Sequence, residues 1–323
     1  MKRISVAPMM DWTDRHCRFF HRLLSPNAVL YTEMVTANAI LHGDKDRHLR
    51  FDPSEHPVVL QLGGSEPNDL ATVAKIGAGF GYDAINLNCG CPSERVQKGA
   101  FGACLMAEPD LVADCVKAMK DAVDIPITVK CRIGIDDYDA KTMLFSFIEK
   151  VSAAGCDTFV VHARKAWLKG LSPKENREVP PLDYDLAHEA KKQFGLSIIL
   201  NGGIATVDDT VAHLANFDGV MLGRAAYQNP GILQDLETTL SGTPPRGLPE
   251  IVDAMIAYAA DQKARYGAPL NAITRHMVGL PNGRRGARRW RQLLTVDSLR
   301  AEKPQDVLIP ALKAISEPPE LVA

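Results

Sequence analysis

Short apolar runs alternate with amphipathic segments through the first two thirds of the chain. The apolar runs are bounded by turn residues, which is typical of strands buried on both faces of a parallel sheet. They predict strands at Ile4–Ala7, Ala28–Tyr31, Val58–Leu62, Ala84–Leu87, Ile127–Lys130, Thr158–His162, Ser197–Leu200 and Gly219–Leu222. The amphipathic segments predict helices at Leu70–Gly77, Leu111–Ala122, Ala140–Ala153, Tyr184–Gln193 and Val207–Ala215. Eight strands that alternate with helices indicate an α/β fold of the (β/α)8 TIM barrel type.

The pattern changes after the last of these strands. Residues Thr243–Gly247 contain two prolines and a glycine, a composition typical of a linker, and the rest of the chain has only the periodicity of helices. These helices are predicted at Pro249–Arg265, around Ala272–Val278, at Ala287–Leu294 and at Val307–Ile315. We therefore expect a catalytic TIM barrel at residues 1–243 and a C-terminal all-helical domain at residues 244–323.

An open, doubly wound sheet is the competing architecture. Such a sheet commonly carries a glycine-rich dinucleotide fingerprint directly after its first strand. The glycines at positions 77, 79 and 81 have a different spacing and precede a strand, so we interpret them as the end of a helix. No Gly-Lys-Ser/Thr phosphate loop occurs either, and the barrel is the favoured fold.

Composition places the chain among ordinary globular proteins. Hydrophobic residues make up 46% and charged residues 24% of the 323 residues, which argues against a disordered chain. No apolar run approaches the roughly 18–20 residues of a transmembrane helix and no signal peptide is evident, so we expect no membrane association. The seven cysteines form no repeated framework, and we interpret them as the reduced thiols of a cytoplasmic protein.

Charge is distributed unevenly along the chain. The net charge is −2, which by itself argues against a nucleic-acid partner. Residues 244–323, however, contain 12 lysines and arginines against 8 aspartates and glutamates, whereas residues 1–243 contain 25 against 31. A basic helical segment therefore follows an acidic barrel, an asymmetry that suggests contact with a polyanion.

Functional residues of a TIM barrel lie at the carboxyl ends of the strands and in the loops that follow. Seven of the eight predicted strands end in polar, reactive or glycine residues, namely Pro8-Met9-Met10, Gln61, Asn88-Cys89-Gly90-Cys91-Pro92, Lys130, His162-Ala163-Arg164, Asn201-Gly202-Gly203 and Gly223-Arg224. The last two sets follow the strands after which barrels commonly hold phosphate. Glycine backbones, a helix N-terminus and an arginine suit such a group; the alternative is that the glycines only form tight turns.

Lys130 is expected at the barrel mouth because it directly follows the apolar residues of its strand. An unpaired ammonium group is unfavourable there, so Lys130 needs a partner. The partner would be a reduced flavin or a substrate carboxylate, or Lys130 would form a Schiff base with a substrate. A carboxylate of the protein itself is the structural alternative. His162 and Arg164 face the same mouth and are expected to contact a ligand, although a histidine at a strand end is often only structural.

Cys91 lies between a glycine and a proline in the loop after the strand Ala84–Leu87. The spacing from Cys89 is short and no second Cys or His pair with ligand spacing follows, so no metal is expected. A thiol in a restrained, partly open loop near a lysine can act as a nucleophile or as an acid. The remaining cysteines, Cys17, Cys89, Cys104, Cys115, Cys131 and Cys156, are interpreted as structural.

Together these stretches resemble the tRNA-dihydrouridine synthases. The similarity runs across nearly the whole barrel in the order of that family, at Val6–Asp14, Thr32–Val35, Gln61–Gly64, Asn86–Ser93, Thr128–Gly134, Val161–Arg164, Asn201–Ile204 and Gly223–Ala225. Two further stretches, Lys169–Arg177 and Gly286–Arg291, resemble the A-type branch, which acts on uridines 20 and 20a of the tRNA D-loop. The chain departs from this branch at Gly279–Gly283, where the branch has an aromatic residue after the leucine.

The resemblance implies an enzyme that reduces uridine to 5,6-dihydrouridine with FMN as cofactor and NADPH as reductant. The FMN contacts that it implies are Pro8, Met9, Met10, Gln61, Lys130, His162, Asn201, Gly202, Gly203, Gly223 and Arg224. Hydride would pass from flavin N5 to C6 of uracil, and Cys91 would protonate C5. Asn88 would touch the target base, which must leave its stack to reach a barrel mouth. The expected substrate contacts are Asn88, Arg164, Lys174, Arg177, Arg288 and Arg291.

The basic run Arg284–Arg291 would then bind tRNA in the helical domain. Its arginines would contact phosphates, and Trp290 would either stack on a base or pack in the helical core; the alternative is a solvated helix face with a buried tryptophan. A small-molecule flavin ene-reductase or dihydroorotate-type oxidoreductase is the nearest alternative function, since it shares the barrel but needs no arginine-rich tail. An aldolase-like barrel without flavin and a non-catalytic tRNA-binding protein are more distant, and no protein partner is evident.

Overall fold

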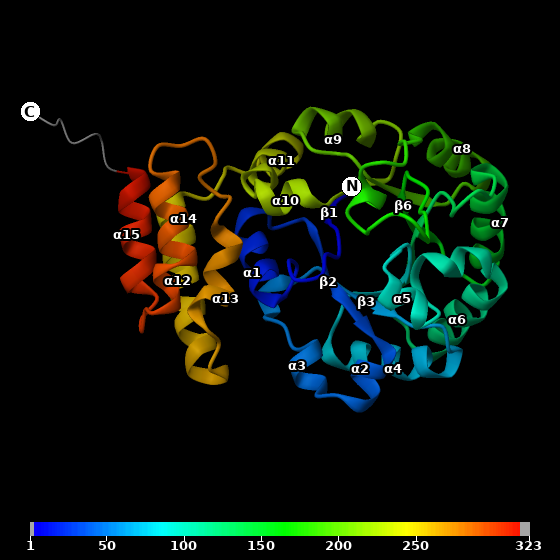
Figure 1. Cartoon of the computed structure of the whole chain (residues 1–323), viewed down its shortest axis with the longest axis horizontal. Coiled ribbons are helices and arrows are strands. Elements are labelled where there is room, and N and C mark those ends of the chain that lie inside the picture. The colour runs from blue at the N-terminus through cyan, green and yellow to red at the C-terminus, as the bar shows by residue number, and fades with distance from the viewer. Residues whose placement is uncertain (1–2, 317–323) are drawn as a thin grey trace, which may run out of the picture. The chain divides into compact units, whose positions relative to one another are not determined.

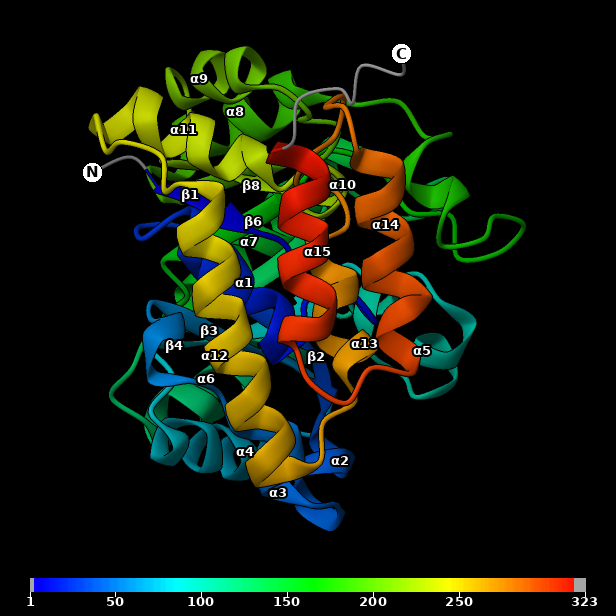
Figure 2. The ribbon, with the colours of Figure 1, turned by 90° about the vertical axis from the view of Figure 1, so that its left-hand side faces the viewer.

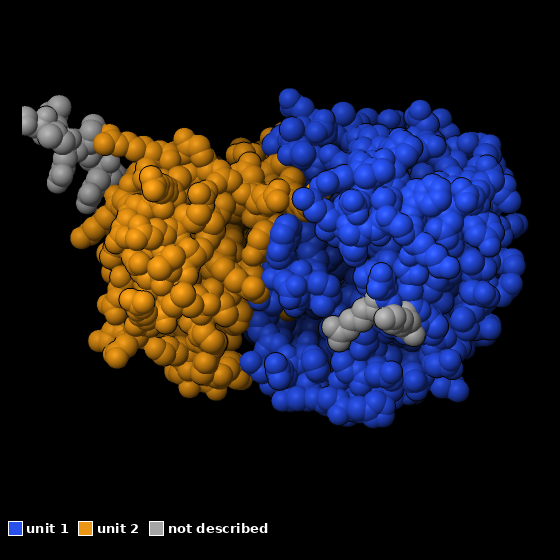
Figure 3. Space-filling view, in the orientation of Figure 1, with its two compact units in different colours: residues 1–15, 28–223 blue, residues 16–27, 224–323 orange. Residues whose placement is uncertain are grey.

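The computed structural model describes the backbone of residues 3–316 and the side chains of this range other than those of residues 3, 95, 98 and 316. Contacts between residues divide the chain into two compact units, which Figure 3 colours separately. The first unit comprises Met1–Arg15 and Ala28–Gly223, and the second comprises His16–Asn27 and Arg224–Ala323.

The first unit is a closed barrel of eight parallel strands. They are β1 (Arg3–Val6), β2 (Val29–Thr36), β3 (Val58–Gly63), β4 (Ala84–Cys89), β5 (Ile127–Arg132), β6 (Thr158–His162), β7 (Ser197–Asn201) and β8 (Gly219–Leu222). Each strand pairs with its neighbours in the sequence, and β8 pairs with β1 to close the sheet. The predicted (β/α)8 barrel is therefore confirmed, with every predicted strand present.

Helices surround the strands of this unit in Figure 1. They are α2 (Ala37–His42), α3 (Lys45–Leu49), α4 (Pro67–Phe80), α5 (Glu94–Lys98), α6 (Pro109–Ala122), α7 (Ala140–Ala153), α8 (Tyr184–Phe194) and α9 (Val207–Leu214). Helix α4 ends at Gly81, whose φ of 93° lies in the left-handed region that glycine tolerates. This confirms that the glycines at 77, 79 and 81 end a helix.

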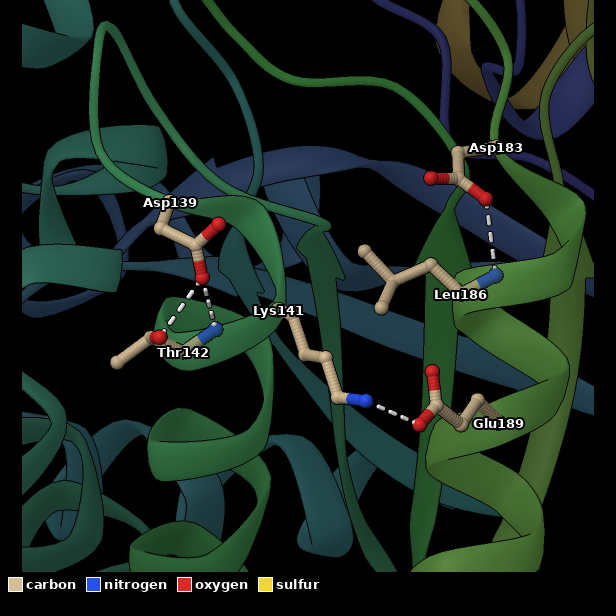
Figure 4. A network of polar contacts seen from close by, with 6 residues as sticks. All are labelled: Asp139, Lys141, Thr142, Asp183, Leu186 and Glu189. Carbon is tan, nitrogen blue, oxygen red and sulfur yellow. Dashed lines mark hydrogen bonds and ion pairs between the residues drawn. The ribbon is translucent and has the colours of Figure 1, made fainter.

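Helices α7 and α8 show why such elements begin where they do. Asp139 accepts the N–H of Thr142 at 2.8 Å, and Asp183 accepts the N–H of Leu186 at 2.9 Å. These carboxylates satisfy backbone donors that the first helical turn leaves unpaired. In Figure 4 both caps lie at the same end of the two helices, which an ion pair between Lys141 and Glu189 also connects.

Apolar side chains from separate strands fill the barrel interior. One cluster joins Ala7, Tyr31, Val59, Val160 and Met221, all of them buried. These residues come from the beginning, middle and end of the unit, so the core forms only when the sheet closes. Above this packed layer, the strand ends can carry polar groups.

Strand β2 extends beyond its predicted end at Tyr31 to Thr36. Its pairing with β3 shifts register between Tyr31 and Met34, and the polar residues Thr32 and Glu33 lie at this irregularity. An irregular pairing interrupts the alternation of side chains along a strand. Thr32 and Glu33 therefore lie beyond the strand end predicted at Tyr31.

The second unit is helical. It contains most of α1 (Arg15–Leu24), with α10 (Arg224–Gln228), α11 (Gly231–Ser241), α12 (Leu248–Tyr266), α13 (Leu270–Thr274), α14 (Ala287–Thr295) and α15 (Gln305–Ser316). Figure 2 shows α12, α14 and α15 side by side. No helix in the described part of the chain is both long and apolar enough to span a membrane.

Contacts between residues end the first unit at Gly223 and group residues His16–Asn27 with the second unit. Helix α1 packs within the second unit, because Phe19 stacks on Tyr258 with 3.9 Å between ring centroids and His16 Nδ1 lies 2.8 Å from the Tyr258 hydroxyl. Ser25 and Asn27 also donate hydrogen bonds to the Glu237 carboxylate. A linker-like composition at Thr243–Gly247 does not reveal such contacts between distant segments.

Candidate active site

The loop after β4, here called the Cys91 loop (Gly90–Ser93), holds its thiol in a fixed turn. Asn88 Oδ1 begins the turn by accepting the backbone N–H groups of Gly90 and Cys91, each at 3.0 Å. The carbonyl of Cys91 accepts the N–H of Ala103 at 2.9 Å. The thiol is half-buried, with Sγ 3.5 Å from Ser93 Oγ. The backbone around Cys91 is thus held while the sulfur stays partly accessible.

A chain of buried side chains connects Asn88 to the barrel interior. Asn88 Nδ2 donates to Gln61 Oε1 at 2.9 Å, and Gln61 Nε2 donates to Asn86 Oδ1 at 2.8 Å. Asn86 Nδ2 in turn donates to Thr128 Oγ1 at 2.9 Å. Buried amides are stable when their polar atoms are paired, so these bonds fix the orientation of each amide. Within the described structure, Asn88 and Gln61 each retain one amide N–H without a partner.

Lys130 lies on β5 next to Asn88, its partner across the β4–β5 pair. Its side chain is half-buried, and no described residue forms a hydrogen bond or an ion pair with its ammonium group. Burial, followed by the charge of Arg132, lowers the pKa of Lys130 to about 8, while Cys91 acts in the opposite direction. A desolvated cation without an anionic partner is unfavourable. The mouth of the barrel is therefore suited to an anionic ligand.

Arg132 is a site residue that sequence reasoning missed. It ends β5, is only 3% exposed, and lies beside His162 across the β5–β6 pair. Its Nε donates to the Gly90 carbonyl at 3.0 Å, and its Nη1 donates to the carbonyls of Lys165 and Asn176 at 3.1 and 2.7 Å. Burial lowers the pKa of Arg132 to about 10. Because the acceptors belong to loops, strand position alone gives no signal for this role.

His162 ends β6 and packs against the glycine turn after β7. A Cβ on Gly202 would lie 2.6 Å from Cδ2 of the His162 ring, and φ is 111° at Gly202 and 71° at Gly203. Only glycine adopts both angles readily and leaves room for the ring. The Tyr184 hydroxyl donates to the Gly202 carbonyl at 2.7 Å. Burial, with the nearby cations, lowers the pKa of His162 well below its usual range, so the imidazole is neutral.

The turns after β7 and β8 have features of an anion site. Among the described residues, none accepts a hydrogen bond from the backbone N–H of Gly202 or Gly203. Unpaired N–H groups in such turns can bind anions. Asn201 Nδ2 donates to the Met221 carbonyl at 2.8 Å and connects the ends of β7 and β8, which the two turns follow. A Cβ on Gly223 would meet nothing nearer than 4.0 Å, a distance that it would have to Met9 Sδ.

The segment Pro8–Met10 follows β1 and leads into a strained residue. Asp11 has a φ of 65°, which is uncommon for residues other than glycine. Its N–H donates to the Glu33 carboxylate at 2.5 Å. Met10 is 57% exposed, whereas Met9 packs against the barrel core. Glu33 lies in the irregular part of β2, beyond the strand end predicted at Tyr31, so strand position gave it no individual role.

The loop after β6, here called the basic loop (residues 163–183), is organised by Asn176. This side chain is fully buried; its Nδ2 donates to the Trp167 carbonyl at 2.9 Å and its Oδ1 accepts the Trp167 N–H at 2.7 Å. Arg164 donates to backbone carbonyls later in the same loop. Lys174 and Arg177 are exposed. The loop thus has a buried polar centre and a cationic surface.

Helix α14 of the second unit carries the C-terminal arginines. Arg288 and Arg291 are exposed, and their spacing places them on one helix face; neither forms an ion pair with a described residue. Arg289, in contrast, pairs with Asp297 at 3.2 Å. Trp290 is fully buried and its Nε1 donates to a backbone carbonyl 3.1 Å away. The tryptophan therefore belongs to the helical core.

The predicted site residues thus fall into three groups. The strand ends of the first unit carry Pro8, Met9, Met10, Gln61, Asn88, Cys91, Lys130, His162, Asn201, Gly202, Gly203 and Gly223. Arg164, Lys174 and Arg177 share the basic loop. Arg224, which begins α10, belongs to the second unit together with Arg288 and Arg291. In the described part of the chain, no three His, Cys, Asp or Glu residues are grouped as a metal site would require.

A parallel barrel with a fixed thiol, an unpaired lysine and open glycine turns at its strand ends defines a TIM-barrel enzyme that handles an anionic ligand. Its sequence specifies the class further. The chain belongs to the dihydrouridine synthase (Dus) family, whose sequence pattern matches residues 5–316. The enzymes of this family are oxidoreductases.

Curated relatives cover nearly the whole chain. A tRNA-dihydrouridine(20/20a) synthase of Xanthomonas campestris pv. campestris is 58% identical over 294 residues, which are 91% of this chain and 88% of the relative. Proteins with the same name from Vibrio vulnificus and Escherichia coli K12 are each 54% identical over 319 residues. These alignments cover 98% of this chain and 97% and 92% of the two relatives.

Proposed function

We propose that this chain is an FMN-dependent enzyme that uses NADPH to reduce uridine to 5,6-dihydrouridine at positions 20 and 20a of the tRNA D-loop. The observation that carries the proposal is the placement of Cys91, in a held turn, near a lysine that lacks an anionic partner. The names of the curated relatives supply the substrate and its positions.

The strand ends fit FMN in two respects. The backbone N–H groups of Gly202 and Gly203, without acceptors in the described structure, suit the phosphate. The ammonium group of Lys130 suits the electron-rich edge of the ring system. The residues proposed to hold FMN are Pro8, Met9, Met10, Gln61, Lys130, His162, Asn201, Gly202, Gly203, Gly223 and Arg224.

If these residues hold FMN and NADPH reduces it, the cofactor would supply a hydride for C6 of the uracil ring. Cys91 acts as the general acid, and its Sγ gives a proton to C5. Lys130, charged below a pKa of about 8, stabilises negative charge at the mouth. Asn88 holds the uracil edge through the amide N–H that has no partner in the described structure. A uridine must be extruded from its stack to reach these groups.

Recognition of tRNA involves surfaces outside the barrel mouth. Arg164, Lys174 and Arg177 of the basic loop and Arg288 and Arg291 of α14 are proposed to contact the RNA. Exposed arginines bind phosphates and release counterions, which makes RNA binding dependent on salt. We assign the helical domain at residues 244–323 a part in tRNA binding beside the basic loop, and we expect the enzyme in the cytoplasm, where its substrate occurs.

The test is an anaerobic single-turnover reaction of the purified protein, reduced with one equivalent of NADPH, with unmodified tRNA while its absorption spectrum is recorded. We expect a flavin band that bleaches with NADPH and recovers as dihydrouridine forms at positions 20 and 20a. A tRNA with cytidine at both positions is the matched control and should leave the flavin bleached. A bleached flavin that ignores both RNAs would indicate a small-molecule reductase, and a protein without flavin would overturn the assignment of Lys130 and the glycine turns.

A further inference from the structure

The Cys91 loop is connected to the basic loop on both sides of the thiol. Before Cys91, the Gly90 carbonyl accepts a hydrogen bond from Arg132, which also donates to two carbonyls of the basic loop. After Cys91, the Pro92 carbonyl accepts a hydrogen bond from Gln97 Nε2 at 2.8 Å, and the same nitrogen donates to the Leu168 carbonyl at 2.8 Å. Gln97 thus connects the two loops with a single amide group.

Gln97 lies at the edge of a hollow between the Cys91 loop and the basic loop. Pro92 and Gln97 on one side and residues 168–173 on the other line a hollow of about 750 Å³. Gln97 is half-buried in α5, and its own N–H donates to the Ser93 carbonyl at 3.0 Å. Both amide protons of its side chain have acceptors, and these acceptors belong to different loops.

We propose that Gln97 is a positioning residue that makes the basic loop a support of the Cys91 thiol, so that RNA bound to Lys174 and Arg177 also orders Cys91. The part of this inference that concerns RNA rests on the proposed function, whereas the connection between the loops does not. Asn176 has the corresponding structural role within the basic loop, because it folds the loop whose carbonyl Gln97 binds. No contact of Gln97 with substrate or cofactor is invoked.

The first experiment measures the alkylation rate of Cys91 by iodoacetamide in the full-length protein without tRNA, resolved by peptide mass spectrometry. Gln97→Met keeps the length of the side chain but removes both hydrogen bonds. The loss of two such bonds favours local opening by about five- to thirtyfold, and we expect Cys91 to react faster by that factor. Amide hydrogen exchange in the basic loop should rise in parallel.

Gln234→Met is the matched control. Gln234 Nε2 also donates to a backbone carbonyl, that of Arg246 at 2.9 Å, within the second unit. This variant should leave the Cys91 rate unchanged. An unchanged Cys91 rate in Gln97→Met would overturn the proposal, as would an equal acceleration of the buried Cys89 and Cys131, which indicates general unfolding. If Gln97→Met does not fold, Gln97→Glu provides the same test, because its carboxylate cannot donate to the two carbonyls.

A double-mutant cycle separates coupling from a purely local effect. Asn176→Ala changes a residue outside the Cys91 loop and is expected to accelerate the alkylation of Cys91. Adding Gln97→Met to it should then change the rate little further; two independent effects that multiply would contradict the coupling. In turnover assays Gln97→Met should lower kcat with normal flavin content. If Cys91 were not the proton donor, the alkylation result would stand while this loss of kcat would be absent.

Discussion

The barrel mouth and helix α14 differ in how far their cationic side chains are buried. At the mouth, burial lowers the pKa of Lys130 to about 8 and that of Arg132 to about 10. On α14, Arg288 and Arg291 are exposed, and the buried residues of the helix are Trp290, Leu293 and Leu294. A buried cation is unfavourable until a ligand or carbonyl groups compensate it, whereas an exposed one is solvated and gains energy only near a polyanion. The first arrangement suits the proposed chemistry on a bound ligand, and the second suits the proposed binding of RNA phosphates.

The largest expected effect comes from the thiol at the mouth. Cys91→Ala should lower the single-turnover rate of dihydrouridine formation by about 10²–10⁴-fold, the usual contribution of a general acid. Cys104→Ala is the control, since Cys104 is also half-buried but its thiol donates to the Phe101 carbonyl at 3.1 Å. Full activity of Cys91→Ala would contradict the role of Cys91 as general acid. The proposed difference in function between the barrel mouth and α14 would then lose its main support.

On α14 the corresponding large effect concerns stability. Trp290→Ala removes a fully buried ring and its hydrogen bond, and should lower the free energy of unfolding of the helical unit by about 3–5 kcal/mol. Arg291→Ala, one position further along, should change it by less than about 0.5 kcal/mol. Denaturant titrations followed by far-ultraviolet circular dichroism, which reports helix content, measure the free energy of unfolding of both variants. Equal effects of the two variants would contradict the division of α14 into a structural face and a solvated one.

The sequence predicts features that depend on neighbouring residues better than features that depend on contacts between segments far apart in the chain. Buried apolar runs predict the strands, and the end of a strand predicts the place of Lys130 and Cys91. The roles of Gln97, Arg132 and Asn176 escape such reasoning, because their partners are backbone carbonyls that only the folded loops bring within reach. The grouping of α1 with the second unit escapes it for the same reason, since it rests on contacts between segments far apart in the chain.

The pH dependence of ligand binding sharpens the description of the mouth. A bound anion raises the pKa of Lys130, so the complex holds more protons than the free protein above the free pKa of about 8. The contribution of Lys130 to the affinity for reduced FMN should therefore be constant below this pH. Above it, this contribution should lower the affinity by at most about tenfold per pH unit. Lys130→Met should bind reduced FMN more weakly, and its affinity should lack the fall above a pH of about 8. Anaerobic titrations of the apoprotein measure the difference between the two proteins, and parallel curves would remove Lys130 from the site.

The smallest effect concerns the exposed face of α14. Arg288→Ala combined with Arg291→Ala removes two arginines without an ion pair in the described structure, and should weaken tRNA binding while the slope of log K against log salt decreases by about one to two. Arg289→Ala is the matched control from the same helix. Because Arg289 is already paired with Asp297, its loss should change the slope less than the loss of either neighbour. Flavin content should stay normal in all variants. An unchanged slope for the double variant would show that α14 does not touch RNA phosphates, and the cations that bind tRNA would then be those of the basic loop.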